Sequence, residues 1–122
     1  MTIDQCTVIG YGAPLTDDSV SALCNAVDLK PRYYRDLQGA EHRWEDDFPD
    51  VLIHIIDEYG NGNVVYAMAN PHFMHAHAMS ESVVLPADIF ARRFEKQLEA
   101  FLRHYGLEAA RGVEPLLLFD YY

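Results

Sequence analysis

A strand-turn-strand pattern in the middle of the chain is the feature that most constrains its fold. Residues 51–57 and 64–68 are rich in β-branched and apolar side chains, which favour extended backbone. The loop between them contains Asn61-Gly62, a pair that favours the left-handed conformations of tight hairpin turns. Because an isolated hairpin is only marginally stable in water, other parts of the chain must add strands or cover one face of it.

Two segments with helical periodicity can provide that cover. Thr16 is a good N-cap for the first helix, which ends near Pro31. Pro86 and Asp88 open a longer second helix over residues 87–105. Each helix has one apolar stripe, which predicts one buried face. The stripes are Val20, Leu23, Cys24 and Val27 in the first helix, and Phe90, Phe94, Leu98, Phe101, Leu102 and Tyr105 in the second.

Short apolar runs near the two ends predict further strands, at residues 6–11 and 116–119. Asn70-Pro71 is expected to end the second arm of the hairpin, and residues 72–85 leave open a fifth strand. We predict one α+β domain over residues 1–122, with a mostly antiparallel sheet of four to five strands and two helices on one face. The order is β-α-β-β-(β)-α-β, for which a ferredoxin-like arrangement and other α+β topologies both stay open.

The charge of the chain is strongly acidic. Nineteen Asp and Glu stand against nine Lys and Arg, which gives a net charge of −10. The first sixty residues hold twelve acids and four bases, so −8 of this charge lies there. A domain of this sign is repelled by nucleic acids and anionic membranes and attracted to basic protein surfaces. The alternative is that the charge serves solubility alone.

Residues 41–58 concentrate this charge. They contain seven acids and one base, a balance of −6, with Trp44 and Phe48 interleaved. An aromatic anchor ringed by carboxylates is typical of a site that binds a basic protein surface. The alternative is a solvated loop with Trp44 folded into the core. The predicted partner-binding residues are Trp44, Glu45, Asp46, Asp47, Phe48, Asp50, Asp57 and Glu58.

A basic and aromatic run at residues 30–35 is a second candidate site. Such a run can hold a phosphate while a tyrosine stacks on a base. The alternative, which the overall charge favours, is a loop that balances the acidic segment after it. The ligand contacts would come from Arg32, Tyr33, Tyr34 and Arg35.

His72, His75 and His77 are a third candidate site. Three imidazoles can bind Zn²⁺ or Ni²⁺ and leave one coordination position for water. No HExxH motif, cysteine pair or fixed carboxylate accompanies them in the sequence. We therefore prefer a polar strand face to a metal site.

No motif in the chain specifies an enzyme or a cofactor. There is no GxSxG, and the Gly10-Tyr11-Gly12 run continues into Ala13-Pro14, so it is not a dinucleotide or phosphate loop. Cys6 and Cys24 are interpreted as small buried apolar residues. No wholly apolar run approaches the length of a membrane span, and no signal-peptide pattern opens the chain, so we expect a cytoplasmic protein.

Three features resemble short accessory proteins of tailed bacteriophages. These are the opening Thr7-Val-Ile-Gly-Tyr-Gly12, the capped helix after it and the closing apolar strand at residues 116–122. The resemblance implies a host-takeover or anti-defence role, since small acidic inhibitors that occupy the nucleic-acid groove of a defence complex are found among such proteins. We expect a non-enzymatic protein that binds a basic surface of a nucleic-acid-handling complex. The alternative is a small-ligand or metal-binding module.

Overall fold

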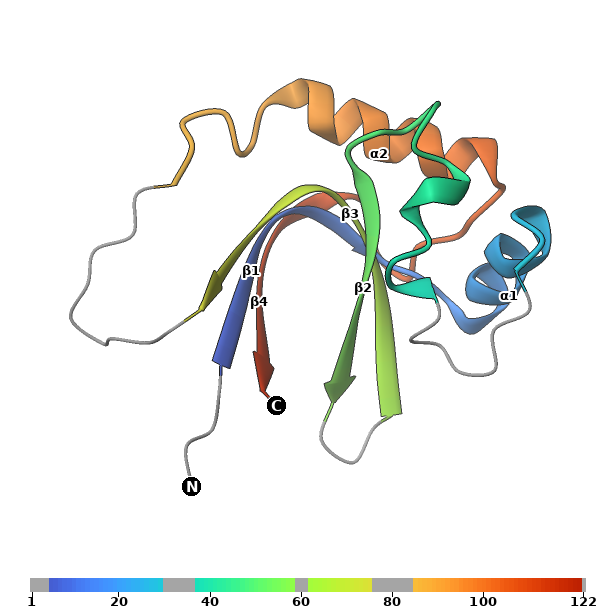
Figure 1. Ribbon diagram of the computed structural model, residues 1–122, viewed down its shortest axis with the longest axis horizontal. Helices are drawn as coiled ribbons and strands as arrows, with labels where there is room; N and C mark the ends of the chain where they lie inside the picture. Colours follow the sequence, from blue (N-terminus) through green and yellow to red (C-terminus); the bar gives the residue numbers. More distant parts are fainter. Residues whose placement is uncertain (1–4, 30–36, 59–61, 76–84, 122) are drawn as a thin grey trace.

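The computed structural model of the chain describes residues 5–29, 37–58, 62–75 and 85–121. Its four strands form one antiparallel sheet in the order β2-β3-β1-β4 (Figure 1). Together with the two helices, this confirms the predicted α+β class. The elements are β1 (Gln5–Pro14), α1 (Asp17–Ala26), the short 3-10 helix η2 (Glu41–Arg43), β2 (Val51–Glu58), β3 (Gly62–His75), α2 (Arg92–His104) and β4 (Glu114–Tyr121).

The predicted hairpin is present. Strands β2 and β3 pair in antiparallel register from Val51 opposite Ala69 to Glu58 opposite Gly62. Strand β3 also pairs with β1, so it lies between β1 and β2. The order β-α-β-β-α-β with β3 inserted between β1 and β2 is the split β-α-β connectivity of a ferredoxin-like arrangement.

Two predictions about β3 are wrong: that it ends at Asn70-Pro71, and that residues 72–75 open a separate strand. Asn70 adopts a left-handed conformation with φ 47°, and β3 continues beyond it and Pro71 to His75 instead of ending there. Residues 72–75 therefore belong to β3 and form no separate fifth strand, while residues 76–84 lie outside the described part. The register of β1 against β3 shifts between Ile9 and Tyr11, beside this point. A register irregularity of this kind bends a sheet locally, and Figure 1 shows the sheet as an arch.

Both helices contribute to one core on the outer face of the arch. Helix α2 lies across the arch and α1 lies beside one end of it (Figure 1). The Thr16 hydroxyl accepts a hydrogen bond from the Ser19 N–H at 3.2 Å, as a capping residue should. Helix α1 ends earlier than predicted, at Ala26. Its buried stripe joins that of α2 in one cluster that includes Val20, Leu23, Cys24, Phe94, Leu98 and Phe101.

Helix α2 begins at Arg92, five residues after the predicted start. The preceding residues form turns, in which the Ile89 N–H donates to Pro86 O and the Ala91 N–H to Asp88 O. Phe90 therefore lies outside the helix and is 39% exposed, so its predicted burial is wrong. No helix in the described ranges is both long and apolar enough to cross a membrane.

The inner face of the arch holds a second, smaller cluster of Val8, Ile56, Tyr66 and Met68. Gly12 lies against it, because a Cβ atom at this position would approach Leu116 Cδ1 to 2.9 Å and Met68 Cγ to 3.3 Å. The absence of a side chain at Gly12 therefore leaves room for the Leu116 and Met68 side chains over β1 on this face.

Candidate functional site

An acidic turn joins η2 to β2. Within this turn, residues 44–48, the N–H groups of Asp47 and Phe48 both donate to Trp44 O, at 3.1 and 2.8 Å. The three residues between the aromatic ends are Glu45, Asp46 and Asp47, and all three are exposed. The local backbone thus presents three consecutive carboxylates to solvent from a hydrogen-bonded turn.

The two aromatic residues point the other way. Trp44 is 2% exposed and Phe48 is 9% exposed. Both rings meet Phe101 of α2 edge to face, with centroids 5.3 Å away for Trp44 and 5.4 Å for Phe48. The indole Nε1–H of Trp44 donates to Val51 O at 2.7 Å, which satisfies its polar group inside the core.

This burial corrects the predicted role of Trp44 and Phe48 as exposed anchors. The sequence places both beside carboxylates, but α2 brings the large apolar surface of Phe101 against them from more than fifty residues further along. Burying two aromatic rings there is more favourable than leaving them in water. The two rings are therefore part of the scaffold of the turn, and its exposed surface consists of the carboxylates.

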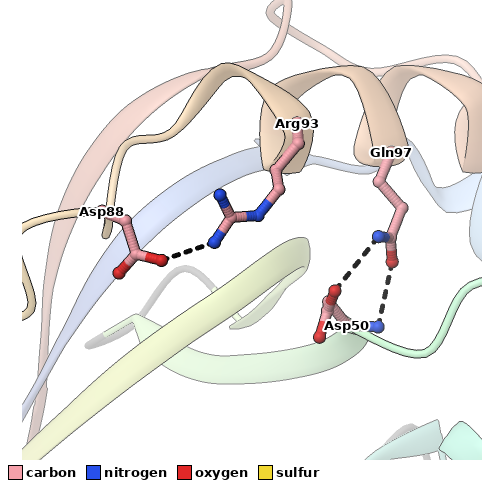
Figure 2. A network of polar contacts seen from close by, with 4 residues as sticks. All are labelled: Asp50, Asp88, Arg93 and Gln97. Carbon is pink, nitrogen blue, oxygen red and sulfur yellow. Dashed lines mark hydrogen bonds and ion pairs between the residues drawn. The ribbon is translucent and has the colours of Figure 1, made fainter.

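Asp50 is fixed to helix α2. Its backbone N–H donates to Gln97 Oε1 at 2.9 Å, and Gln97 Nε2 donates to Asp50 Oδ2 at 3.2 Å. Figure 2 shows this reciprocal pair beside an exposed ion pair between Asp88 and Arg93. Asp50 therefore joins the start of β2 to α2, which makes it a support of the acidic turn. The sequence analysis did not identify Gln97 as a partner of Asp50. Its place on α2, next to the apolar stripe, was the one feature that indicated a contact with the rest of the fold.

Asp57 and Glu58 lie at the opposite end of β2. Their backbones pair with Asn63 and Gly62, beside the hairpin loop. Seven residue steps separate Asp57 from Asp50, which corresponds to roughly 23 Å along a strand. The predicted acidic segment is therefore divided between two places, and only Glu45, Asp46 and Asp47 share one exposed turn.

The charge of the turn acts on its surroundings. Burial, and second the charge of Asp47, raise the pKa of Tyr105 above its usual value. Arg43, the one base in the segment, donates to Val27 O at 3.5 Å. Within the described ranges, no ion pair involves Glu45, Asp46 or Asp47. Their carboxylates remain available to an external cation.

The other predicted sites are largely outside the described residues. This applies to Arg32, Tyr33, Tyr34 and Arg35 in full, and to His77. His72 is half-buried in β3, and the backbone of His75 ends that strand opposite Cys6. In the part of the chain that the structure describes, no three His, Cys, Asp or Glu side chains are grouped to hold a metal ion.

Comparison of the chain with protein-family models, with curated proteins and with solved structures finds no match.

Proposed function

We propose that this protein is a non-enzymatic binding protein whose acidic turn docks on a basic surface of a protein partner. The observation that carries the proposal is the exposure of three consecutive carboxylates, at Glu45, Asp46 and Asp47. They lie on a turn whose two aromatic ends, Trp44 and Phe48, are buried in the core. A turn already held in shape loses little conformational freedom on binding, which favours affinity.

The partner surface would be rich in Lys and Arg. Carboxylates accept short charge-assisted hydrogen bonds from both, and an Arg can engage one of them in a bidentate pair. The excess charge of the first sixty residues, −8, would add long-range attraction and increase the rate of encounter. Since the same field repels phosphate backbones, we propose that the partner is a protein, such as an inhibited nucleic-acid-handling complex of the host.

The site is tested with a fluorescently labelled oligolysine peptide as the probe. Changing Glu45→Gln, Asp46→Asn and Asp47→Asn raises the net charge from −10 by three, to −7. Each exposed pair contributes about 0.2–1 kcal/mol, so we expect the affinity to fall by roughly tenfold. Fluorescence anisotropy at low salt measures this loss.

A matched control separates the turn from the general field. The variant Asp17→Asn, Asp18→Asn and Glu99→Gln changes three exposed carboxylates elsewhere and has the same net charge of −7. We expect it to retain most of the affinity for the peptide. Equal losses in the two variants would show that only the overall charge matters, and the acidic turn would not be a site.

A further inference from the structure

We propose that two copies of this chain associate through their β4 strands, in antiparallel and two-fold symmetric pairing. The sheet order leaves two outer strands, β2 and β4. The outer edge of a strand presents backbone N–H and C=O groups that can pair with another strand. Among the described residues, the two edges differ in whether side chains form hydrogen bonds with these outer backbone groups.

The β2 edge is capped by side chains of the preceding segment. Trp44 Nε1 donates to Val51 O at 2.7 Å, and Gln38 Oε1 accepts the Ile55 N–H at 2.5 Å. For β4, the hydrogen bonds found among the described residues join its backbone only to β1. In the part of the chain that the structure describes, β4 is therefore the outer strand with no hydrogen bond on its free side, and we infer that this edge accepts another strand.

The middle of strand β4 lacks the charged side chains that usually protect an exposed edge. Five uncharged residues, 115–119, lie between Glu114 and Asp120, with no Lys or Arg among them. Leu117 and Phe119 are 52% and 48% exposed, and their spacing of two places them on the same face of the sheet. Pro115 limits pairing only near the start of the strand.

A second copy of β4 is the occupant that fits this edge. In a two-fold pairing, residues directly opposite each other point to the same face. A register centred on Leu118 places Leu117 of each copy opposite Phe119 of the other. Both exposed apolar pairs are then covered on one face, and Leu118 meets its own equivalent on the other face.

The charge distribution favours the same surface. Residues 61–122, which include β4, hold seven acids and five bases, a balance of −2 against −8 for the first sixty residues. Within β4 the two acids, Glu114 and Asp120, lie near its ends, so the residues between them bring no charge to the interface, which limits the mutual repulsion of two copies. The acidic turn adjoins β2 at the other edge of the sheet, so the dimer leaves it accessible.

Sedimentation velocity over a concentration series tests the association with the full chain. We expect the mass to rise from 13.9 kDa toward twice that value with concentration. Leu117→Lys and Phe119→Lys, each at an exposed position, should keep the chain monomeric with unchanged circular dichroism. Phe90→Lys, at an exposed apolar position outside β4, is the control and should still dimerise. A wild-type chain that is monomeric at millimolar concentration, or a dimer unaffected by both β4 variants, would overturn the proposal.

Disulfide trapping tests the register. In the proposed pairing the two Leu118 Cα atoms are about 4.5–5.5 Å apart, within the span of a disulfide. The two Leu116 Cα atoms are four residue steps apart along the strands, about 13 Å, which is too far. Leu118→Cys should therefore give a covalent dimer under mild oxidation, while Leu116→Cys and the wild type should not. Trapping through Leu116→Cys alone would contradict this register.

Discussion

At the scale of single residues, Trp44 holds the acidic turn in place through two kinds of contact. Its ring packs against Phe101, and its indole N–H donates to Val51 O at the start of β2. The same hydrogen bond caps the edge of β2. The Trp44 side chain thus connects the turn, the core and the edge strand β2. Its removal should destabilise all three.

Two substitutions separate the ring from the hydrogen bond. Trp44→Ala removes a buried aromatic ring and should cost about 3–5 kcal/mol of unfolding free energy. Trp44→Phe keeps an aromatic ring and loses the N–H, which should cost about 1–3 kcal/mol because Val51 O is left unsatisfied. Urea unfolding measures both values. If Trp44→Ala were as stable as the wild type, Trp44 would not be a core residue.

Tyr105 gives the fold a dependence on alkaline pH. Burial, and then the charge of Asp47, raise its pKa, so the folded state favours the neutral phenol. Above the ordinary tyrosine pKa of about 10, the unfolded chain loses this proton while the folded chain retains it, and stability falls as pH rises. Tyr105→Phe should therefore lose less stability than the wild type between neutral pH and high pH, in urea midpoints measured across this range.

A control for the role of Tyr105 uses the second cause of its raised pKa, the charge of Asp47. Asp47→Asn removes the charge near the phenol and should reduce the alkaline loss in part, because burial still acts. Burial also raises the pKa of the Cys24 thiol, so some alkaline loss should remain in every variant. Identical pH profiles for the wild type and Tyr105→Phe would contradict the role of Tyr105.

The exposure of the carboxylates in the candidate site could be predicted from the sequence. Whether the side chains of Trp44 and Phe48 point into the core or to solvent could not. Glu45, Asp46 and Asp47 are charged and therefore expected at the surface. Trp44 next to them is compatible with either an exposed anchor or a core residue, since the choice depends on Phe101 far along the chain. Asp57 was grouped with Asp50 by proximity in sequence, but an extended strand separates them.

At the scale of elements, two glycines in β1 allow atoms of the neighbouring strands to approach its backbone closely. A Cβ atom at Gly10 would lie 3.1 Å from Pro71 Cα, and one at Gly12 would lie 2.9 Å from Leu116 Cδ1. The first contact is to backbone beside the bend of β3, whereas the second is to the end of a flexible side chain. The two positions should therefore respond differently to the same substitution.

A mutant cycle tests this difference. Gly10→Ala should destabilise the fold by about 1–3 kcal/mol for overpacking, and Gly12→Ala by less, because the end of the Leu116 side chain can move aside. Leu116→Ala removes the atom that Gly12→Ala would strike, so this pair should show a favourable coupling in the unfolding free energy. Leu116→Ala should show no such coupling with Gly10→Ala, which meets Pro71 instead. Strict additivity of the first pair would mean that the contact at Gly12 does not limit packing.

The elements themselves were largely predictable because their signals are local. The Thr16 cap, the α2 stripe and the hairpin turn each lie within a few residues of the structure that they specify. The bend at Asn70 and the late start of α2 were not predictable from such signals. Asn70-Pro71 is usually read as the end of a strand, but pairing of β3 with β1 continues past it to His75.

At the scale of the whole molecule, the two proposed surfaces lie at opposite edges of one sheet and differ in chemistry. The acidic turn adjoins β2 and carries charge, while the β4 edge is apolar between Glu114 and Asp120. We therefore propose that a chain of net charge −10 combines a surface that attracts basic partners with one through which its own copies meet. Salt should act on the two associations with opposite sign.

Sedimentation velocity and peptide anisotropy across a sodium chloride series measure the two signs in the same protein. Salt screens the attraction between the acidic turn and oligolysine, so binding of the peptide should weaken steeply as salt increases. Salt also screens the repulsion between two chains of −10 each, so dimerisation through β4 should strengthen over the same range. The variant Glu45→Gln, Asp46→Asn and Asp47→Asn should flatten the first dependence strongly. It should alter the second only through its smaller net charge. If salt weakened dimerisation, charged contacts would hold the two copies together, and an apolar β4 interface would be wrong.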